Sequence, residues 1–298
     1  MVTITLLSDF GLTDPYVAEM KGVILSANHD LRLVDVSHGI ERHNIAMGSF
    51  ILETALPYFP QGSIHVAVVD PGVGTERLPL VVLCELGVLV GPDNGLLVRA
   101  AERLGFKAAY QIDSPRFKGK KVSATFHGRD VFAGMAAKLA DGLRPDAVGA
   151  LVKELVRLDI PSVNVSDEGI TCTVLHVDSF GNVILNLSEE EFLRLGLHED
   201  RRLEVKTMQG GSSASIARTY SEIHRDRLGI ILGSQGYVEI AMRESSAAAR
   251  LGLKPLDQVE IRFSQPCRSL KCPSDVHHHR SSSGRWRRPL ERVLSTAR

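Results

Sequence analysis

Four short glycine-containing turns in the N-terminal half of the chain carry charged side chains that could do chemistry. They span residues 8–11, 70–74, 91–95 and 125–130. Any one of them is ordinary material for a tight turn or a helix cap. With their close neighbours they hold this set of polar residues: Asp9, Asp14, Asp70, Arg77, Asn94, His127 and Arg129. Carboxylate, guanidinium and imidazole groups in one cleft can bind a polar ligand, hold a cation or move a proton.

The elements around these turns predict that the turns meet at one edge of a sheet. Strand-like apolar runs occupy residues 4–8, 31–36, 64–69, 80–86 and 108–112. Apolar residues at helical spacing alternate with them, at residues 15–27, 44–58, 94–104 and 130–140. This alternation predicts an α/β domain with a mostly parallel sheet and helices on both faces. Ligands bind beyond the carboxyl ends of such strands, where most of the turns lie.

The pattern changes after Pro161. Short strand-like runs follow with little helix between them, at residues 170–177, 183–187, 203–206, 229–232, 237–241 and 258–263. They predict a smaller, mainly β domain that is barrel-like. The resulting organisation is an α/β substrate and catalytic domain at residues 1–150, a linker at 151–160, a β-barrel-like domain at 161–263 and a tail at 264–298.

The composition fits a two-domain globular protein. A chain of 298 residues with 44% hydrophobic content can bury two cores. Lys+Arg and Asp+Glu are both 35, so no overall field attracts nucleic acid or an anionic membrane. No run reaches the ~18 to 20 uncharged apolar residues of a membrane span, and the first ten residues lack signal-peptide features. We therefore expect a cytoplasmic protein with no nucleic-acid or membrane partner.

The last 35 residues, 264–298, differ from the rest of the chain. They hold eight Lys or Arg residues against two acidic ones, and they lack an apolar period that could bury a face. We expect a disordered basic tail. A nucleic-acid arm, or a zinc site built from Cys267, Cys272 and the histidines at 277–279, is the weaker interpretation because the spacing matches no usual zinc finger.

Taken in chain order, five motifs give the sequence its clearest resemblance. They are residues 8–11 with 14–17, residues 69–75 with Arg77, residues 91–95, residues 125–130, and Asp-Ser-Phe-Gly-Asn at 178–182. This set resembles the family of S-adenosyl-L-methionine (SAM) hydroxide adenosyltransferases. These are adenosine-forming SAM hydrolases, relatives of the SAM-dependent chlorinase and fluorinase. The resemblance covers about residues 3–263.

The resemblance implies how the substrate is bound. SAM would lie between the N-terminal domain of one subunit and the C-terminal domain of its neighbour in a homotrimer. Asp9 would hold the ribose hydroxyls, and Phe180 and Asn182 would contact the adenine. The methionine end would be met by Asp14, Asp178 and Ser234. Asn94 joins this substrate-binding set, and no metal or organic cofactor is implied.

The resemblance also implies the reaction, hydrolysis of SAM to adenosine and L-methionine. Asp70, Arg77 and His127 match the set that positions and activates water, whereas the halogenating relatives are expected to carry Tyr in place of Asp70. Attack on the ribose C5′ of a sulfonium expels neutral methionine, so the leaving group needs no general acid. Either Asp70 or His127 takes the proton, or the whole set delivers hydroxide, since a neighbouring arginine weakens a carboxylate as a base.

Two rival functions stay open on the sequence. The chain could be a SAM or adenosine binding module without catalysis. It could also be a metal-dependent phosphoesterase, because several side chains could supply hard oxygen and imidazole ligands. These are Asp9, Asp14, Asp70, Asp93 and His127. The physiological purpose of SAM hydrolysis also stays open.

Overall fold

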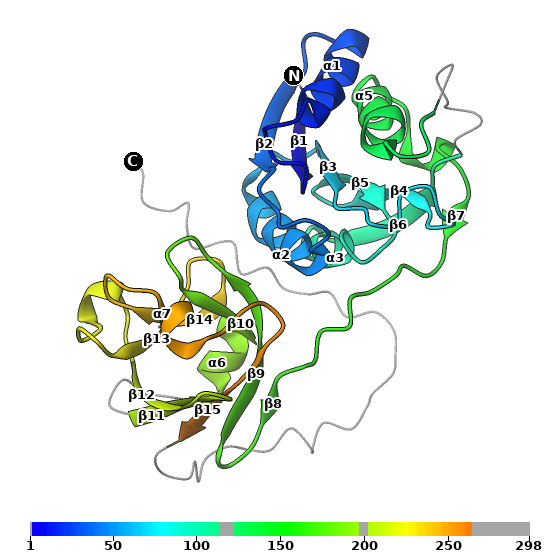
Figure 1. Cartoon of the computed structure of the whole chain (residues 1–298). Helices are drawn as coiled ribbons and strands as arrows, with labels where there is room; N and C mark the ends of the chain where they lie inside the picture. Colours follow the sequence, from blue (N-terminus) through cyan, green and yellow to red (C-terminus); the bar gives the residue numbers. More distant parts are fainter. Residues whose placement is uncertain (1, 114–121, 197–201, 264–298) are drawn as a thin grey trace, which may run out of the picture.

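The computed structural model describes residues 2–113, 122–196 and 202–263; the predicted tail at 264–298 lies outside these ranges. The described residues form an α/β domain followed by a β-barrel domain (Figure 1). The predicted fold class is therefore confirmed in both halves.

The sheet of the first domain has a parallel half and an antiparallel half. Its strand order is β2-β1-β3-β5-β4-β6-β7. The strands are β1 (Thr3–Ser8), β2 (Arg32–Ser37), β3 (Ser63–Val68), β4 (Pro79–Cys84), β5 (Gly87–Pro92), β6 (Phe106–Gln111) and β7 (Leu151–Val152). Neighbours from β2 to β5 run parallel, whereas β4, β6 and β7 pair antiparallel. The polar turns after β1, β3 and β5 therefore leave the parallel half at the same edge.

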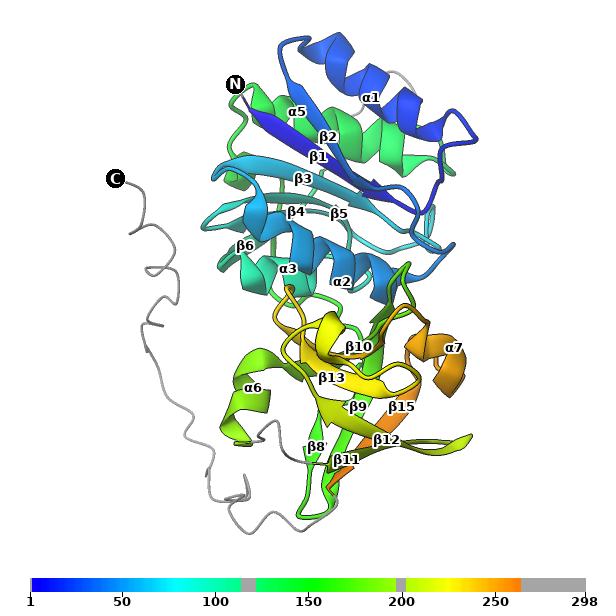
Figure 2. The same ribbon diagram turned by 90° about the vertical axis from the view of Figure 1, so that its left-hand side faces the viewer.

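Helices cover both faces of this sheet, as predicted (Figure 2). One face carries α1 (Tyr16–Ala27), the π-helix η2 (Gly128–Ala133) and α5 (Gly134–Ala140). The other carries α2 (Ile45–Ala55), η1 (Leu56–Tyr58) and α3 (Val98–Arg103). Successive residues of β1 serve different cores, since Leu6 packs toward the first group of helices and Leu7 toward the second. Burial on both faces explains why two consecutive residues of the strand are leucines and why all six of its residues are buried.

The second domain is a closed seven-stranded barrel. The strands follow the order β10-β14-β13-β12-β11-β15-β9, and pairing of β10 with β9 closes the ring. Their bounds are β9 (Gly169–Val177), β10 (Val183–Ser188), β11 (Arg202–Thr207), β12 (Gly210–Ile216), β13 (Leu228–Leu232), β14 (Tyr237–Met242) and β15 (Gln258–Phe263). The short β8 (Asn164–Val165) pairs with β9 outside the ring. Closure leaves no open edge among the seven strands.

Short helices complete the described structure. The barrel domain carries α6 (Glu189–Arg194), η4 (Tyr220–Glu222) and α7 (Ala247–Leu251), and the first domain carries η3 (Pro145–Ala147). Ser188 opens α6 with a capping box, in which it accepts from the Glu191 backbone N–H. None of the helices within the described ranges is long and apolar enough to cross a membrane.

A small apolar contact joins the two domains within one chain. The buried ring of Phe50 on α2 packs against Leu175 and Ile184 of the barrel. The same ring stacks on His176, with ring centroids 5.5 Å apart. Beside it, Tyr237 of β14 donates to Glu53 at 2.7 Å. The barrel is therefore held against α2 by both packing and hydrogen bonding.

Replacing Phe50 with alanine tests this contact. The variant Phe50→Ala should lower the free energy of unfolding by about 3 to 5 kcal/mol, because it removes a buried ring and leaves a cavity. Denaturant unfolding measures the change, with Leu193→Ala as the control. Leu193 is 61% exposed, so its truncation should cost no more than about 0.5 kcal/mol. Equal losses for the two variants would contradict the assignment.

Candidate active site

Three of the predicted side chains form one partly buried cluster at the edge of the first domain. Arg77, which lies just before β4, donates from Nε to Asp70 Oδ1 at 2.9 Å and from Nη2 to Asp70 Oδ2. The same Nη2 lies 2.8 Å from Nδ1 of His127. The side chains of Arg77 and Asp70 are 9% and 5% exposed. The structure therefore brings Asp70, Arg77 and His127 together, as the turn pattern predicted.

This geometry assigns the proton of the His127 ring. A guanidinium group has donors only, so the nitrogen that faces Arg77 must act as the acceptor. Nδ1 of His127 is thus unprotonated when this hydrogen bond is present, and the neutral ring carries its proton on Nε2. His127 can then donate from Nε2, and it has no vacant nitrogen with which to accept a proton.

The support beneath Arg77 comes from the π-helix that follows His127. The Arg77 guanidinium carbon lies 5.3 Å from the ring centroid of Phe132, which is fully buried. A cation over an aromatic face is stabilised by the ring's negative potential. π-helical turns are rare and often occur at functional sites. Here the turn places the Phe132 ring below the guanidinium and His127 beside it.

Close packing holds the turn that carries Asp70 against the turn that precedes His127. Gly74 has a φ of +80°, and a Cβ at this position would lie 2.6 Å from the Ala124 carbonyl oxygen. Only glycine tolerates both the backbone conformation and the approach. The turn that carries His127 is further stabilised by Asp130, which accepts from the Ser123 N–H at 2.7 Å and from Arg129 Nε at 2.6 Å. The hydrogen bond from Arg129 lowers the pKa of Asp130.

Arg129 itself is used for this bracing. Besides Asp130, it contacts Glu19 of α1 at 2.7 Å, and its guanidinium carbon lies 5.0 Å from the Phe126 ring centroid. Phe126 in turn packs edge-on against Tyr16, with centroids 5.2 Å apart. The sequence had placed Arg129 among the groups facing the cleft, but its described contacts fix the position of the loop that carries His127.

The two N-terminal acids predicted to bind substrate differ in their surroundings. Asp9 is partly buried, and its Oδ2 accepts from the backbone N–H of His43 at 2.9 Å. Its Oδ1 makes no hydrogen bond with the other described residues. Asp14 is exposed one residue before the helix-capping Pro15 of α1, and it makes no hydrogen bond within the described ranges. Both carboxylates can therefore accept hydrogen bonds from a ligand.

Asn94 makes backbone hydrogen bonds at the end of β3. Its Nδ2 donates to the Val69 carbonyl at 2.8 Å, and its Oδ1 accepts from the Leu96 N–H at 3.2 Å. Val69 directly precedes Asp70, so Asn94 braces the backbone from which that carboxylate projects. The predicted helix at 94–104 begins later, at Val98, because the preceding residues form this braced turn.

The C-terminal residues of the predicted site form a second cluster. Asp178 Oδ1 accepts from the backbone N–H groups of Phe180 and Asn182, each at 2.9 Å, and its Oδ2 accepts from Asn182 Nδ2 at 2.9 Å. The side chain of Phe180 in this turn is 80% exposed. The turn thus presents an aromatic face and the remaining amide oxygen of Asn182.

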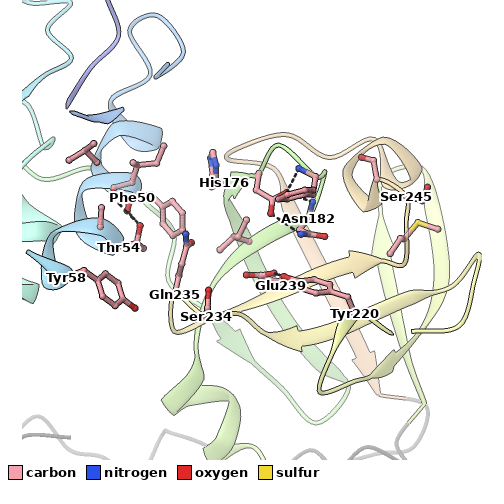
Figure 3. Close-up of a pocket in the computed structure, with 18 of the residues that line it drawn as sticks. Phe50, Thr54, Tyr58, His176, Asn182, Tyr220, Ser234, Gln235, Glu239 and Ser245 are labelled. Carbon is pink, nitrogen blue, oxygen red and sulfur yellow. Dashed lines mark hydrogen bonds between the residues drawn. The ribbon is translucent and has the colours of Figure 1, made fainter. Parts of the chain in front are cut away.

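A cavity of about 1030 Å³ lies between this cluster and α2 (Figure 3). Its barrel side includes all four C-terminal residues predicted for the site: Asp178, Phe180, Asn182 and Ser234. Its other side is formed by α2 through Phe50, Ile51, Thr54 and Ala55. None of the N-terminal site residues lines it. Within one chain, the structure therefore places the predicted residues in two separate groups.

The sequence analysis missed three polar residues of this cavity. Glu239, Tyr220 and His176 all line it. Burial raises the pKa of the Glu239 carboxyl, raises the pKa of Tyr220 to about 12 and lowers the pKa of His176. Glu239 lies in a strand of apolar residues, and a single acid at an outward position of such a strand resembles ordinary surface alternation. Its charge among apolar neighbours was the one available signal.

Comparison with known proteins agrees with this two-domain arrangement. Residues 4–149 match the sequence model of the SAM hydroxide adenosyltransferase N-terminal domain, and residues 172–260 match that of the C-terminal domain. The (R)-S-adenosyl-L-methionine hydrolase of Methanocaldococcus jannaschii is 36% identical over 268 residues, which cover 87% of this chain and 95% of the relative. The (R)-S-adenosyl-L-methionine hydrolase of Salinispora tropica is 38% identical over 263 residues, which cover 87% of this chain and 97% of the relative.

More distant and structural relatives extend the comparison. The fluorinase of Nocardia brasiliensis is 25% identical over 289 residues, which cover 87% of this chain and 96% of the relative. A solved structure, described as an uncharacterized conserved protein from Thermotoga maritima, superimposes with a TM-score of 0.82 at 33% identity, covering 87% and 99% of the two chains.

Fold and site together define a two-domain α/β and β-barrel protein with a partly buried Asp-Arg-His cluster at the sheet edge. The chain belongs to the SAM hydroxide adenosyltransferase family. The resemblance predicted from the five sequence motifs is thereby confirmed.

Replacing Asn94 with aspartate tests its bracing role. The change keeps the shape and the acceptor for Leu96, but it turns the donor toward Val69 into a second acceptor. We expect Asn94→Asp to lower the free energy of unfolding by about 1 to 3 kcal/mol, since a carbonyl loses its partner. Chemical denaturation measures this, with the exposed Asn164→Asp as control. A fully stable Asn94→Asp variant would refute the bracing role.

Proposed function

We propose that this chain hydrolyses SAM to adenosine and L-methionine. The observation that carries the proposal is the hydrogen-bonded cluster of Asp70, Arg77 and His127. Relatives between 36% and 39% identical over most of the chain are named (R)-S-adenosyl-L-methionine hydrolase. Because those names specify the (R) form, the first assay should supply both sulfonium configurations and follow adenosine and methionine by chromatography.

The cluster suits the activation of one water molecule. Attack on C5′ forms a C–O bond and breaks the C–S bond, whose electron pair leaves with neutral methionine. The water must lose a proton as it attacks. Since His127 Nδ1 accepts from Arg77, His127 is suited to donate from Nε2 to the water oxygen. We therefore assign proton acceptance to Asp70, whose oxygens keep lone pairs beyond those that Arg77 occupies.

Electrostatics and orientation favour this arrangement. Arg77 fixes both oxygens of Asp70, so the carboxylate does not need to reorganise when the water arrives. Hydroxide that develops at this site meets a cationic substrate, and the two charges neutralise each other in the transition state. The nearly complete burial of Asp70 and Arg77 strengthens such interactions relative to bulk water.

We further propose that the complete site forms between subunits of a homotrimer. The barrel cluster of Asp178, Phe180, Asn182 and Ser234 lines a cavity that none of the N-terminal site residues reaches within the same chain. A neighbouring copy would supply the other half. In that assembly Asp9 would hold the ribose hydroxyls and Asp14 the methionine end.

The reaction we propose uses neither metal nor organic cofactor. Arg77 donates to both oxygens of Asp70 and to His127 Nδ1, so its positive charge lies directly beside both groups and would repel a metal cation there. Among the described residues, no three His, Cys, Asp or Glu side chains are grouped to hold a metal ion. The acids of the site are thus better matched to separate contacts with the substrate than to shared coordination.

Chelation tests metal independence. SAM hydrolysis should proceed at an unchanged rate in excess EDTA, because the proposed nucleophile is held by protein side chains alone. A rate that falls in EDTA and returns with added Mg²⁺, Mn²⁺ or Zn²⁺ would overturn metal independence.

Paired variants of Asp70 and Asp9 test the mechanism. Asp70→Asn should lower kcat roughly 10²-fold or more, the scale of losing a positioned base, with most SAM affinity kept. Asp9→Asn should mainly raise KM, because it loses acceptor strength for the ribose hydroxyls. Steady-state kinetics and thermal unfolding of both variants separate chemistry, binding and folding. Near-normal kcat in Asp70→Asn removes Asp70 from the mechanism, and binding of SAM without adenosine formation identifies a non-catalytic module.

A further inference from the structure

Glu239 is a buried carboxylate in the wall of the cavity beside the barrel. It lies on β14, is 6% exposed and lines the cavity together with Tyr220 (Figure 3). The Tyr220 hydroxyl donates to its Oε2 at 2.8 Å. No cation forms an ion pair with it among the described residues. A charged acceptor with one partner is costly to bury, so its retention in a cavity wall points to a ligand.

The backbone around Glu239 makes room for its carboxylate. A Cβ on Gly233 would lie 1.9 Å from Glu239 Oε1, so any larger residue there would displace the acid. Gly233 itself has no side chain that could donate to Oε1. The hydrogen bond from Tyr220 uses Oε2, and Oε1 has neither a side-chain donor nor an ion-pair partner among the described residues.

The neighbouring Asn182 adds a second acceptor. Its Nδ2 and its backbone N–H both donate to Asp178, which leaves the amide Oδ1 as its remaining polar atom. None of the hydrogen bonds within the described part of the chain uses that oxygen. Asn182 and Glu239 line the same cavity, and both offer acceptors. A ligand that complements these two acceptors must direct N–H donors at them and must not direct a lone pair at them.

We propose that Glu239 determines specificity for the amino group of the adenine ring, with Asn182 Oδ1 as its companion acceptor. This inference rests on the proposed function, since it concerns the base of SAM. The exposed ring of Phe180 and the ring of Tyr220 line the same cavity and suit a flat heterocycle better than a flexible amino-acid chain. A 6-oxo purine would direct a carbonyl oxygen at the carboxylate and be rejected.

Nucleoside binding to the native protein tests the inference without catalysis. Calorimetry should show adenosine binding at least about 10-fold more tightly than inosine, because a charged acceptor left unpaired costs more than a neutral hydrogen bond. Equal affinity for the two nucleosides overturns the proposal. Kinetics with SAM and with S-inosyl-L-methionine should show the same preference in kcat/KM.

The variant Glu239→Gln should lose this discrimination. A glutamine amide can accept from an amino group or donate to a carbonyl, so the adenosine-to-inosine ratio should fall to within about 3-fold. The matched control is Glu244→Gln. Glu244 is an exposed acid whose described ion pairs are with Arg225 and Arg243, so its ratio should stay at the native value. Thermal unfolding establishes that each variant is folded.

The outcomes separate this inference from the proposed function. If SAM is hydrolysed but Glu239→Gln keeps the native adenosine-to-inosine ratio, Glu239 does not contact the base and the inference alone fails. If Glu239→Gln weakens SAM but not adenosine, the acid meets the methionine ammonium group, which also overturns it. If the native protein prefers adenosine, Glu239→Gln removes that preference and SAM is never cleaved, the proposed function fails, but recognition of the adenine amino group by Glu239 stands.

Discussion

The contact between the Arg77 guanidinium, Asp70 and His127 is the constraint on which the site depends. It joins the end of β3, the segment before β4 and the turn before the π-helix. A buried ion pair earns little net stability, but loss of one partner leaves an uncompensated charge. The surrounding features all serve its geometry. Gly74 permits the close approach of two turns, Phe132 supports the guanidinium and Asn94 braces the backbone before Asp70.

The two domains present different kinds of side chain. The α/β domain concentrates the ionised groups at the carboxyl edge of its parallel strands, where loops can project without disturbing the sheet. The barrel offers an aromatic face and acceptor groups around a cavity. Contacts of Phe50 and Glu53 with the barrel set the angle between the two surfaces within each chain. In a symmetric assembly, that angle would also decide which neighbouring surface meets the cavity.

The sequence predicted much of this because its strongest signals were local. Turn residues after parallel strands located Asp9, Asp70 and Asn94 at one edge, and alternation with helices defined the first domain. The reversal of β4 was not predicted, since it depends on the short connection that pairs β4 with β5 as a hairpin. Strand β12 was missed because Gly210–Ile216 is rich in glycine and serine. Hydrogen-bond partners could not be predicted from the sequence either. The sequence identifies an asparagine at 94 and an acid at 178, but only the fold shows that both side chains form hydrogen bonds with backbone groups.

The parallel pairing of β12 and β13 has a consequence for evolvability. Two parallel neighbours need a crossing connection, and here it spans residues 217–227 and carries Tyr220 over the outside of the barrel. Ile223 anchors that connection in a small core of its own with Ala217, Ile231 and Ala241. Mutations between Ala217 and Ile223 can therefore change the cavity wall around Glu239 while the strand pairing of the barrel stays intact. A new preference for the base could arise there by few substitutions, with the cluster of Asp70, Arg77 and His127 unchanged.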